Sequence, residues 1–285
     1  MSHRSPTTLR SLTLEHRPIS DGTSAAACVE CTSKPFDRMR PLPADVRRLP
    51  SSVLGSEPPS SPERLLKVLA GDLLRSPHAV VARAVDLGSA GDATWHLPAE
   101  LSGAGLRRRA TFLAGRACAH AALAALNVRT SAIPIGAGGA PVWPKGSVGS
   151  ISHTARVAAA VVASDPPVAG LGLDVEDDNP LDDVGTVGLI CRPDEMPAAQ
   201  APSEAEKLLW GKLVFVVKEA VYKLHHPLGG AFLDFHDVRV TLEPGAGRFC
   251  AEVVHREQRG SAGSLIRGGF VRDSGWLAAL AVFSR

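Results

Sequence analysis

Several features that mark common protein classes are scarce in this sequence. The 285-residue chain has one tyrosine, and aromatic residues make up 5% of it. No apolar run approaches the roughly 18–20 residues that a membrane-spanning helix needs, so we expect no membrane segment. The N-terminal stretch MSHRSPTTLRSLTLEHRPIS has no apolar signal core. These absences predict a cytoplasmic protein.

The chain has a net charge close to zero and few cysteines. Lys+Arg 31 against Asp+Glu 29 gives a net charge of +2, which excludes a strongly basic, nucleic-acid-coating protein but leaves room for a local basic pocket. Five cysteines at irregular spacing do not describe a disulfide framework. Cys28 and Cys31 form a lone CxxC without the second pair that a structural zinc site needs, and we interpret them as incidental. We therefore expect a soluble protein of a reducing compartment.

What the chain does contain is enough apolar material for a core. Hydrophobic residues make up 45% of it, and its length allows one large domain or two small ones. Residues 1–62, rich in Pro, Ser and Thr, predict an irregular N-terminal extension. Beyond it, we expect helices at 62–71, 105–127 and 203–224, and strands at 78–87, 150–154, 157–163, 168–176, 235–243, 248–255 and 275–283.

Two local signals support the ends of these helices. Ser203 and Glu206 form a capping box, S-x-x-E, at the start of the last helix. Asn127 is a plausible C-terminal stop for the helix at 105–127. Residues 63–167 and 168–285 each hold one long helix and several strands, and this content predicts an α+β fold in two halves.

Asp174 and Glu176 lie two residues apart in GLGLDVE. On a strand such residues point to the same side, and two carboxylates held together are costly unless a cation neutralises them. Oxygen ligands of this kind suit hard divalent cations such as Mg²⁺. The alternative interpretation is an ordinary strand end, where these carboxylates enter solvent with Asp177 and Asp178.

A second candidate group lies on the last predicted helix. Glu219 and Lys223 are four residues apart and Lys212 lies seven residues before Glu219, so the three share one face. The residues around them are mostly apolar, and a helix that is apolar nearly all round is buried. Buried charges need partners. The alternative is a solvated face with a helical ion pair.

Basic side chains share one stripe of the helix expected at 105–127: Arg109, Arg116 and His120, with Arg107 and Arg108 beside them. Guanidinium groups suit phosphate oxygens, although a solvent-facing stripe is the alternative.

Ser152 and His153 follow a glycine-rich loop, and such a loop with hydroxyls and a histidine can contact phosphate. The alternative interpretation is an ordinary hydrogen-bonded pair of side chains. The chain has neither a P-loop nor a GxSxG elbow. Taken together, the basic groups, the histidine and the three carboxylates suit a metal-assisted attack on a phosphate ester.

The same segments, in the same order, resemble the 4′-phosphopantetheinyl transferases of the large, single-chain type, particularly the enterobactin synthetase component D branch. The likeness runs over about residues 63–285 and rests on RRRATFLAGRA at 107–117, APVWPKGSVGSISHTA at 140–155, GLDVED at 172–177 and FVVKEAVYKL at 215–224. G-x-D-x-E followed by F-x-x-K-E-A-x-Y-K at this separation is a specific signature. The N-terminal extension has no counterpart in the resemblance.

The resemblance implies a fold and an activity. The fold would be a pseudo-dimer of two similar α+β halves with the active site between them. The activity would be transfer of the phosphopantetheine arm of coenzyme A to a serine of an apo acyl or peptidyl carrier protein, leaving 3′,5′-ADP, in polyketide, nonribosomal peptide or siderophore biosynthesis. Mg²⁺ would be the cofactor and coenzyme A the co-substrate. A monomer without nucleic-acid or membrane partners is expected.

The resemblance also implies roles for individual residues. Asp174, Glu176 and Glu219 would bind Mg²⁺ on the pyrophosphate, and Glu219 or Glu176 would accept the proton of the carrier serine. The expected catalytic set is Asp174, Lys218 and Glu219. The remaining contacts to coenzyme A would come from Lys218 and Lys223 on phosphate charge, Ser152 and His153 at the pyrophosphate, and Arg108, Arg109 and Arg116 at the 3′-phosphate.

One position departs from the family pattern. The loop at 135–141 has no Lys or Arg where family members often carry one, and Lys145 is the candidate substitute. Two competing hypotheses remain. One is a non-catalytic protein that binds coenzyme A or carrier proteins, and the other is nucleic-acid binding through Arg107–Arg109.

Overall fold

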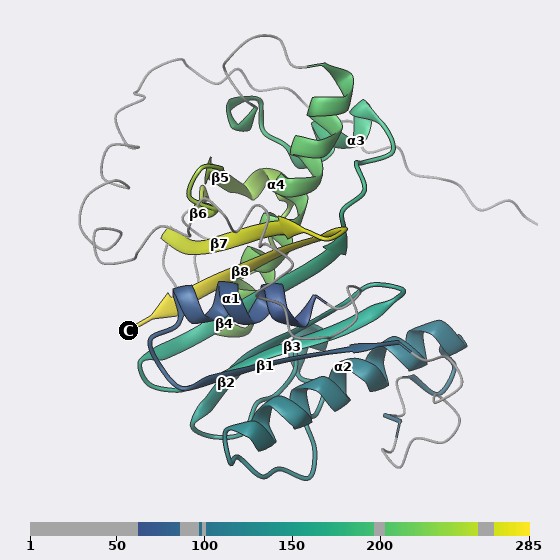
Figure 1. Ribbon diagram of the computed structural model, residues 1–285, viewed down its shortest axis with the longest axis vertical. Helices are drawn as coiled ribbons and strands as arrows, with labels where there is room; N and C mark the ends of the chain where they lie inside the picture. Colours follow the sequence, from purple (N-terminus) through teal and green to yellow (C-terminus); the bar gives the residue numbers. More distant parts are fainter. Residues whose placement is uncertain (1–61, 86–96, 99–100, 197–202, 256–264) are drawn as a thin grey trace, which may run out of the picture. The chain divides into compact units, whose positions relative to one another are not determined.

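Two antiparallel sheets form the framework of the computed structural model, which describes residues 62–85, 97–98, 101–196, 203–255 and 265–285 (Figure 1). All of these residues belong to one compact unit, Met39–Arg285. The extension expected over residues 1–62, with Cys28 and Cys31, lies outside the described residues apart from Pro62. The combination of helices with antiparallel sheets confirms the α+β class.

The chain completes one sheet before it begins the other. The first sheet has the strand order β1-β3-β2 and consists of β1 (His78–Ala84), β2 (Ser147–His153) and β3 (Val157–Ser164). The second has the order β4-β8-β7-β6-β5. Its strands are β4 (Val168–Asp177), β5 (Val238–Glu243), β6 (Arg248–Val253), β7 (Leu265–Asp273) and β8 (Trp276–Ser284).

The α-helices in the described ranges are α1 (Glu63–Leu73), α2 (Leu106–Ala125), α3 (Val184–Ile190) and α4 (Glu204–His225). Alanines and a cysteine of α2 pack on the small residues Ala158 and Ala160 of β3. α4 packs its valines on the second sheet, against residues of β5, β6, β7 and β8. Within the described residues, each helix is too short or too polar to cross a lipid bilayer.

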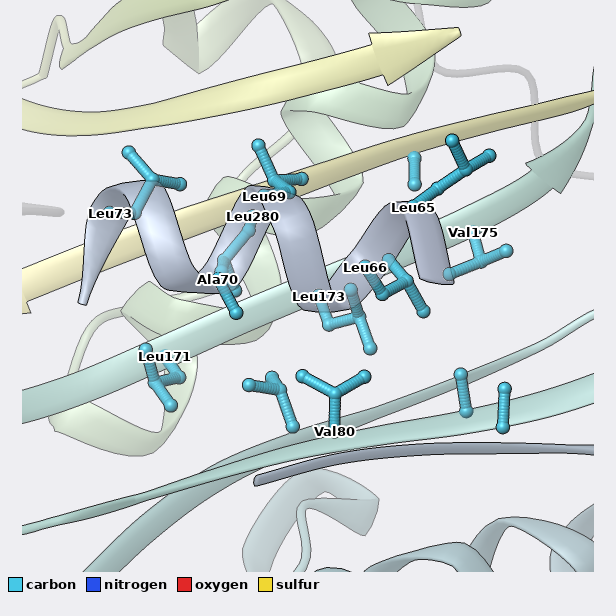
Figure 2. Packing of buried hydrophobic residues seen from close by; sticks show 14 of the residues in the cluster. Leu65, Leu66, Leu69, Ala70, Leu73, Val80, Leu171, Leu173, Val175 and Leu280 are labelled. Carbon is cyan, nitrogen blue, oxygen red and sulfur yellow. The ribbon is translucent and has the colours of Figure 1, made fainter. Parts of the chain in front are cut away.

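α1 lies against both sheets and joins them through one apolar cluster. Figure 2 shows its leucines beside residues of β4, β8 and β1. The cluster includes Leu65, Leu66, Leu69, Ala70 and Leu73 of α1 with Leu171, Leu173, Val175, Leu280 and Val80 of the strands. Successive residues of β3 alternate between this cluster and the one under α2. Because both faces of β3 are covered, its sequence is apolar without alternation.

Serine side chains join β2 to β4, which lie side by side. Ser150 Oγ accepts a hydrogen bond from the Leu173 N–H at 2.9 Å, and Ser152 Oγ accepts one from the Val175 N–H at 3.2 Å. Both serines are buried. The spacing of two residues on both strands keeps the two bonds in register. The buried N–H groups on this edge of β4 are therefore satisfied by hydroxyls instead of by a backbone strand.

Gly172 lets α4 approach β4 very closely. A Cβ at this position would lie 1.9 Å from Ala220 O and 2.7 Å from Leu224 N. Any side chain larger than hydrogen would therefore push the helix away. The close approach brings the helix turn that carries Glu219 and Lys223 onto the face of β4 that carries Asp174.

A buried ion pair fixes α4 on another side. Lys218 Nζ donates to Glu195 Oε2 at 2.7 Å, to Ile190 O at 2.9 Å and to Phe235 O at 2.8 Å. Glu195 Oε1 accepts from the Val240 N–H at 2.6 Å. Both charged side chains are 1% exposed. The pair therefore ties α4 to the end of α3, to the turn before β5 and to β5 itself.

Most elements expected from the sequence are confirmed. The expected helices form α1, α2 and α4, with the Ser203 capping box present and Asn127 in the left-handed region at φ 60°. α3 and β7 were not predicted. Gly268 and Gly269 weaken the strand signal of β7, yet Gly268 is needed because a Cβ there would lie 2.4 Å from the Phe249 ring.

We expect Gly172→Ala to lower the free energy of unfolding by about 3 kcal/mol, because the new methyl group overpacks the β4–α4 contact. Urea denaturation followed by circular dichroism measures the change. Gly71→Ala is the matched control, since no atom lies within 4 Å of its Cβ position, and it should raise stability by about 0.5–1 kcal/mol. Equal stability of Gly172→Ala and the parent chain would contradict the close approach.

We expect Lys218→Met to cost about 3–5 kcal/mol, because it leaves Glu195 buried without its cation. The same denaturation measurement applies. Lys67→Met is the control: Lys67 pairs with Glu63 at 2.6 Å but is 58% exposed, and such surface pairs contribute less than about 1 kcal/mol. Similar losses for the two variants would show that burial of the Lys218 pair has no energetic consequence.

Candidate active site

Polar side chains converge where β2, β4 and α4 meet. Asp174 Oδ1 accepts hydrogen bonds from Lys223 Nζ at 2.6 Å and from Ser152 Oγ at 2.9 Å, and Lys223 Nζ lies 3.1 Å from Ser152 Oγ. Asp174 is 3% exposed. Its second oxygen, Oδ2, is buried and accepts no hydrogen bond from the described residues. One side of this carboxylate is therefore fully used and the other is open to a further partner.

The periods of the strand and the helix bring these residues together. Leu173 and Val175 of β4 face α1, so Asp174 faces the opposite way, toward α4. On α4, Glu219 and Lys223 are one turn apart and share the face that meets β4. Burial and the charge of Asp174 raise the pKa of Glu219 above its ordinary value; Lys223 opposes this rise and Glu176 adds to it. Glu219 therefore lies in the electrostatic neighbourhood of Asp174.

Glu176 has a cation of its own. Its Oε2 accepts a hydrogen bond from Lys212 Nζ at 2.9 Å. Across the described ranges, no group of three or more His, Cys, Asp or Glu side chains is arranged to hold a metal ion. Two of the three carboxylates predicted as metal ligands thus each have a lysine partner, Asp174 with Lys223 and Glu176 with Lys212, and the charge of Glu176 still acts on Glu219.

Asp174 and Glu219 nevertheless fit a hard divalent cation. Asp174 Oδ2 is a buried oxygen without a donor among the described residues. Glu219 holds its charge at a cost, as the direction of its pKa shift shows. A divalent cation between two such carboxylates would relieve both penalties, and Mg²⁺ is commonly bound by one or two carboxylates together with substrate phosphates.

The ammonium group of Lys218 lies in the buried ion pair with Glu195. The sequence places it next to Glu219 and predicts a contact to phosphate. In the structure its ammonium group donates to Glu195, Ile190 O and Phe235 O. All three N–H groups of the lysine are used by the protein. Lys218 also lines the pocket beside Glu219, and its contact to phosphate stays a prediction.

Ser152 also has its hydrogen-bonding capacity filled. Its hydroxyl donates to Asp174 and accepts from the Val175 N–H and from Lys223. A hydroxyl offers one donor and two acceptor positions. The side chain predicted to lie near the pyrophosphate therefore holds the site together, and it leaves no vacant hydrogen-bond position for a ligand.

His153 and Arg108 extend the site toward α2. The Nη1 atom of Arg108 lies 3.4 Å from His153 Nε2. Burial lowers the pKa of His153, with further lowering by Lys223 and Arg108, so its imidazole is neutral at pH 7. Because a guanidinium only donates, Nε2 is the acceptor and Nδ1 carries the proton.

The other predicted arginines lie along α2. Arg116 is 9% exposed, its guanidinium stacks 4.7 Å from the Phe112 ring centroid, and burial lowers its pKa to about 10. Arg109 donates to Ser102 O. In both residues Nε is buried and has no hydrogen-bond partner among the described residues. These two cations therefore retain unused donors.

Two pockets flank the site, and sequence reasoning identified neither. The first, of about 210 Å³, is lined mainly by apolar atoms and lies between Glu219, Tyr222, Phe232 and Phe235. The second, of about 190 Å³, lies between the loop around Gly138 and the residues Tyr222 and Lys223. Tyr222 lines both. Two features of the sequence could have indicated Tyr222: it is the single tyrosine of the chain, and it lies three residues after Glu219 on the same helix.

The glycine-rich loop closes on α4 because it lacks side chains. A Cβ at Gly138, which has φ +62°, would lie 2.2 Å from the His226 ring. The ring of His226 in turn lies 5.4 Å from that of Tyr222. A loop of the first half thus forms one wall of the second pocket, against the C-terminal end of α4.

Two family models match this chain. Residues 97–163 match the 4′-phosphopantetheinyl transferase N-terminal domain, and residues 170–279 match the 4′-phosphopantetheinyl transferase superfamily. The first contains β2, β3 and α2, and the second contains β4 and α4. The residues of the candidate site are thus drawn from both matched regions.

Curated relatives agree with the family models. The chain is 36% identical over 149 residues to the 4′-phosphopantetheinyl transferase Svp of Streptomyces mobaraensis, a match that covers 52% of this chain and 60% of the relative. It is 33% identical over 180 residues to the 4′-phosphopantetheinyl transferase Npt of Nocardia iowensis, covering 61% and 78%. It is 39% identical over 147 residues to enterobactin synthase component D of Salmonella typhi, covering 51% and 55%.

The match to Svp thus spans less than two thirds of that relative, whereas the match to Npt spans more. The resemblance inferred from the sequence motifs is confirmed by both kinds of comparison. The matched regions include Asp174, Glu219, Lys223 and the Ser152–His153 segment. On the two domain matches and the identity to Npt, the chain belongs to the 4′-phosphopantetheinyl transferase superfamily.

Proposed function

We propose that this chain is an enzyme that transfers the 4′-phosphopantetheine arm of coenzyme A to a serine of an apo acyl or peptidyl carrier protein. The products are the holo carrier and 3′,5′-ADP. The observation that carries the proposal is the group Asp174, Ser152 and Lys223, with Glu219 beside it, at the meeting of β2, β4 and α4. Family membership supports the reaction class, and this group supports a charged reaction centre.

The proposal includes a pseudo-dimer in which residues 63–167 and 168–285 are equivalent halves with the active site between them. The two sheets, each with a helix packed on it, support this arrangement. So does the site itself, because Ser152 belongs to the first sheet and Asp174 to the second.

Within the proposal, Asp174, Glu176 and Glu219 would hold Mg²⁺, which would supply neutralisation of the charge that develops on the leaving 3′,5′-ADP. The carrier serine forms an O–P bond to the phosphorus that bears pantetheine, and the bond from that phosphorus to the bridging oxygen breaks. The serine proton passes to a carboxylate. Glu219 is the first candidate for this base, because no described cation forms an ion pair with it, and Glu176 is the alternative.

Cationic and neutral donors of the site would bind the phosphates. Lys223 lines the second pocket and stabilises phosphate charge from beside Asp174. His153 is neutral and donates from Nδ1. Arg108, Arg109 and Arg116 bind the 3′-phosphate, and the unused Nε donors of Arg109 and Arg116 support this role.

The two pockets suit the two ends of coenzyme A. The first pocket has apolar walls beside Glu219 and suits the pantetheine arm, which is largely aliphatic. The second lies beside Lys223 and suits the nucleotide end. Tyr222 separates them. One relative is named enterobactin synthase component D, which supports carriers of siderophore, nonribosomal peptide or polyketide synthases as substrates.

We expect the purified chain, incubated with coenzyme A, Mg²⁺ and an apo carrier domain, to add the mass of one phosphopantetheine to the carrier. Intact-mass spectrometry measures the gain, and EDTA should abolish it. Glu219→Gln should lower the transfer rate on the order of 10²-fold or more, because it removes one carboxylate of the reaction centre. Glu204→Gln, at an exposed position of the same helix, is the control and should keep the parent rate.

Two outcomes would contradict this proposal. Full activity of Glu219→Gln would remove Glu219 from the reaction centre. Binding of coenzyme A without modification of several unrelated carriers would favour a non-catalytic binding protein.

We expect Arg108→Met to raise KM for coenzyme A about tenfold while leaving KM for dephospho-coenzyme A nearly unchanged, because one charge-assisted hydrogen bond to the 3′-phosphate is lost. Steady-state transfer assays with both substrates measure the two values. Arg107→Met, its exposed neighbour, is the control. An equal rise for both substrates would instead place Arg108 on the pyrophosphate, beside His153.

A further inference from the structure

The contact between β2 and β4 joins the two sheets, and we call this contact the seam. The two strands run in the same direction along it, since Ser150 bonds the Leu173 N–H and Ser152 bonds the Val175 N–H. Where both strands begin, the chain itself closes the seam, because residues 165–167 connect β3 directly to β4. This end of the seam is therefore held by covalent bonds.

The opposite, free end of the seam lies next to the candidate site. His153 is the last residue of β2, and Glu176 lies one residue before the end of β4 at Asp177. β2 continues into the turn at 154–156 and β4 into residues 178–183, so the chain does not tie the two strands together here. The free end therefore depends on side-chain contacts.

The side chain of Arg156 reaches across the free end. Its Nε donates to Asp177 Oδ1 at 2.9 Å, and its Nη2 donates to the same oxygen. Its guanidinium carbon lies 4.5 Å from the centroid of the Trp276 ring. Trp276 of β8 is 2% exposed and is paired with Asp177 of β4. An ion pair and a cation–π contact therefore hold this guanidinium on two neighbouring strands of the second sheet.

The backbone of Arg156 is fixed to the first sheet. Thr154 Oγ1 accepts hydrogen bonds from the Arg156 N–H at 3.0 Å and from the Val157 N–H at 3.2 Å. The Thr154 N–H donates to Val157 O at 2.8 Å, and Arg156 O accepts from the Val85 N–H at 2.8 Å. Arg156 thus belongs to the first sheet through its backbone and to the second through its side chain.

A second arginine at the end of β4 forms a similar pair that does not cross the seam. Arg272 of β7 donates from Nε to Asp178 Oδ1 at 2.6 Å, within the second half of the chain. The Arg272 side chain is 39% exposed and that of Arg156 is 60% exposed. Exposed ion pairs contribute little to stability, so the two arginines differ mainly in what they connect.

We propose that Arg156 is a positioning residue of the transfer reaction, because it closes the free end of the seam and so fixes His153 of the first sheet relative to Asp174 of the second. This inference rests on the proposed function for the reaction itself. The guanidinium is occupied by Asp177 and Trp276, so it acts through the geometry of the site and not through a contact to coenzyme A. A displacement of about 1 Å between reacting groups is enough to lower a rate on the order of 10²-fold.

Hydrogen exchange measures the seam directly. In Arg156→Met we expect the Val175 amide, which lies nearer the free end, to exchange about tenfold faster than in the parent chain. The Leu173 amide, two residues closer to the covalently closed end, should change less than about threefold. Arg272→Met is the matched control and should leave both amides unchanged. Nuclear magnetic resonance of ¹⁵N-labelled protein resolves the two amides.

Transfer assays measure the consequence for the reaction. Arg156→Met should lower kcat about tenfold and change KM for coenzyme A less than about threefold, because the groups that bind phosphate stay in place. Asp177→Asn should lower kcat by a similar factor. The double variant Arg156→Met/Asp177→Asn should be no slower than either single variant, since both changes remove one interaction. Arg272→Met should keep the parent kcat and KM.

Unchanged exchange of the Val175 amide in Arg156→Met would overturn the inference, because the pair would then not close the seam. Unchanged kcat would overturn it as well, and a raised KM with unchanged kcat would place Arg156 on coenzyme A instead. Asp177→Asn removes the same pair and decides the question even if Arg156→Met does not fold. A parent chain without transfer activity would overturn the proposed function together with this inference, whereas an active parent with any of the other results overturns the inference alone.

Discussion

One serine hydroxyl holds the two sheets and the polar site in a single arrangement. Ser152 Oγ, on β2, bonds the Val175 N–H and the Asp174 carboxylate of β4 and the Lys223 ammonium of α4. Its one donor and two acceptor positions are filled, so none of these groups moves without breaking a buried hydrogen bond. The apolar cluster around α1 brings the sheets together, and the hydroxyls of Ser150 and Ser152 together set their register.

The polar site also depends on the close approach of α4 to β4 at Gly172. Because Gly172 has no side chain, the carbonyl oxygen of Ala220 can lie 1.9 Å from the position that a Cβ would take. Glu219 and Lys223 lie on either side of Ala220 along α4. Lys223 therefore pairs with Asp174, two residues along β4 from Gly172, and the charge of Asp174 acts on Glu219. The buried Lys218–Glu195 pair holds α4 from another side. The position of Glu219 is thus fixed from two sides. On one side α4 packs closely against Gly172 of β4, and on the other the buried Lys218–Glu195 pair is costly to break.

The motifs could be predicted from the sequence because local periods determine them. A spacing of two on a strand and of four on a helix is enough to place Asp174, Glu219 and Lys223 on facing surfaces. The partners of Lys212 and Lys218 are tertiary. Lys218 bonds the carbonyl groups of Ile190 and Phe235, and the backbone offers such groups at every residue without a sequence signal. The walls of the two pockets, including Tyr222 and Phe232, depend in the same way on loops that carry no period.

α4 combines two features that are normally kept apart. It is apolar nearly all round and packs against the rest of the protein, and it still carries four charged side chains along its packed length. Three of these charges have a partner of opposite charge: Lys212 pairs with Glu176, Lys218 with Glu195 and Lys223 with Asp174. Glu219 keeps a raised pKa beside Asp174 and has no described ion pair. A partly buried charge without an ion pair lowers the stability of the folded protein. Charges of this kind are expected at functional sites. Of these four side chains, Glu219 is thus the one without an ion pair among the described residues, and the proposed function assigns it a divalent cation.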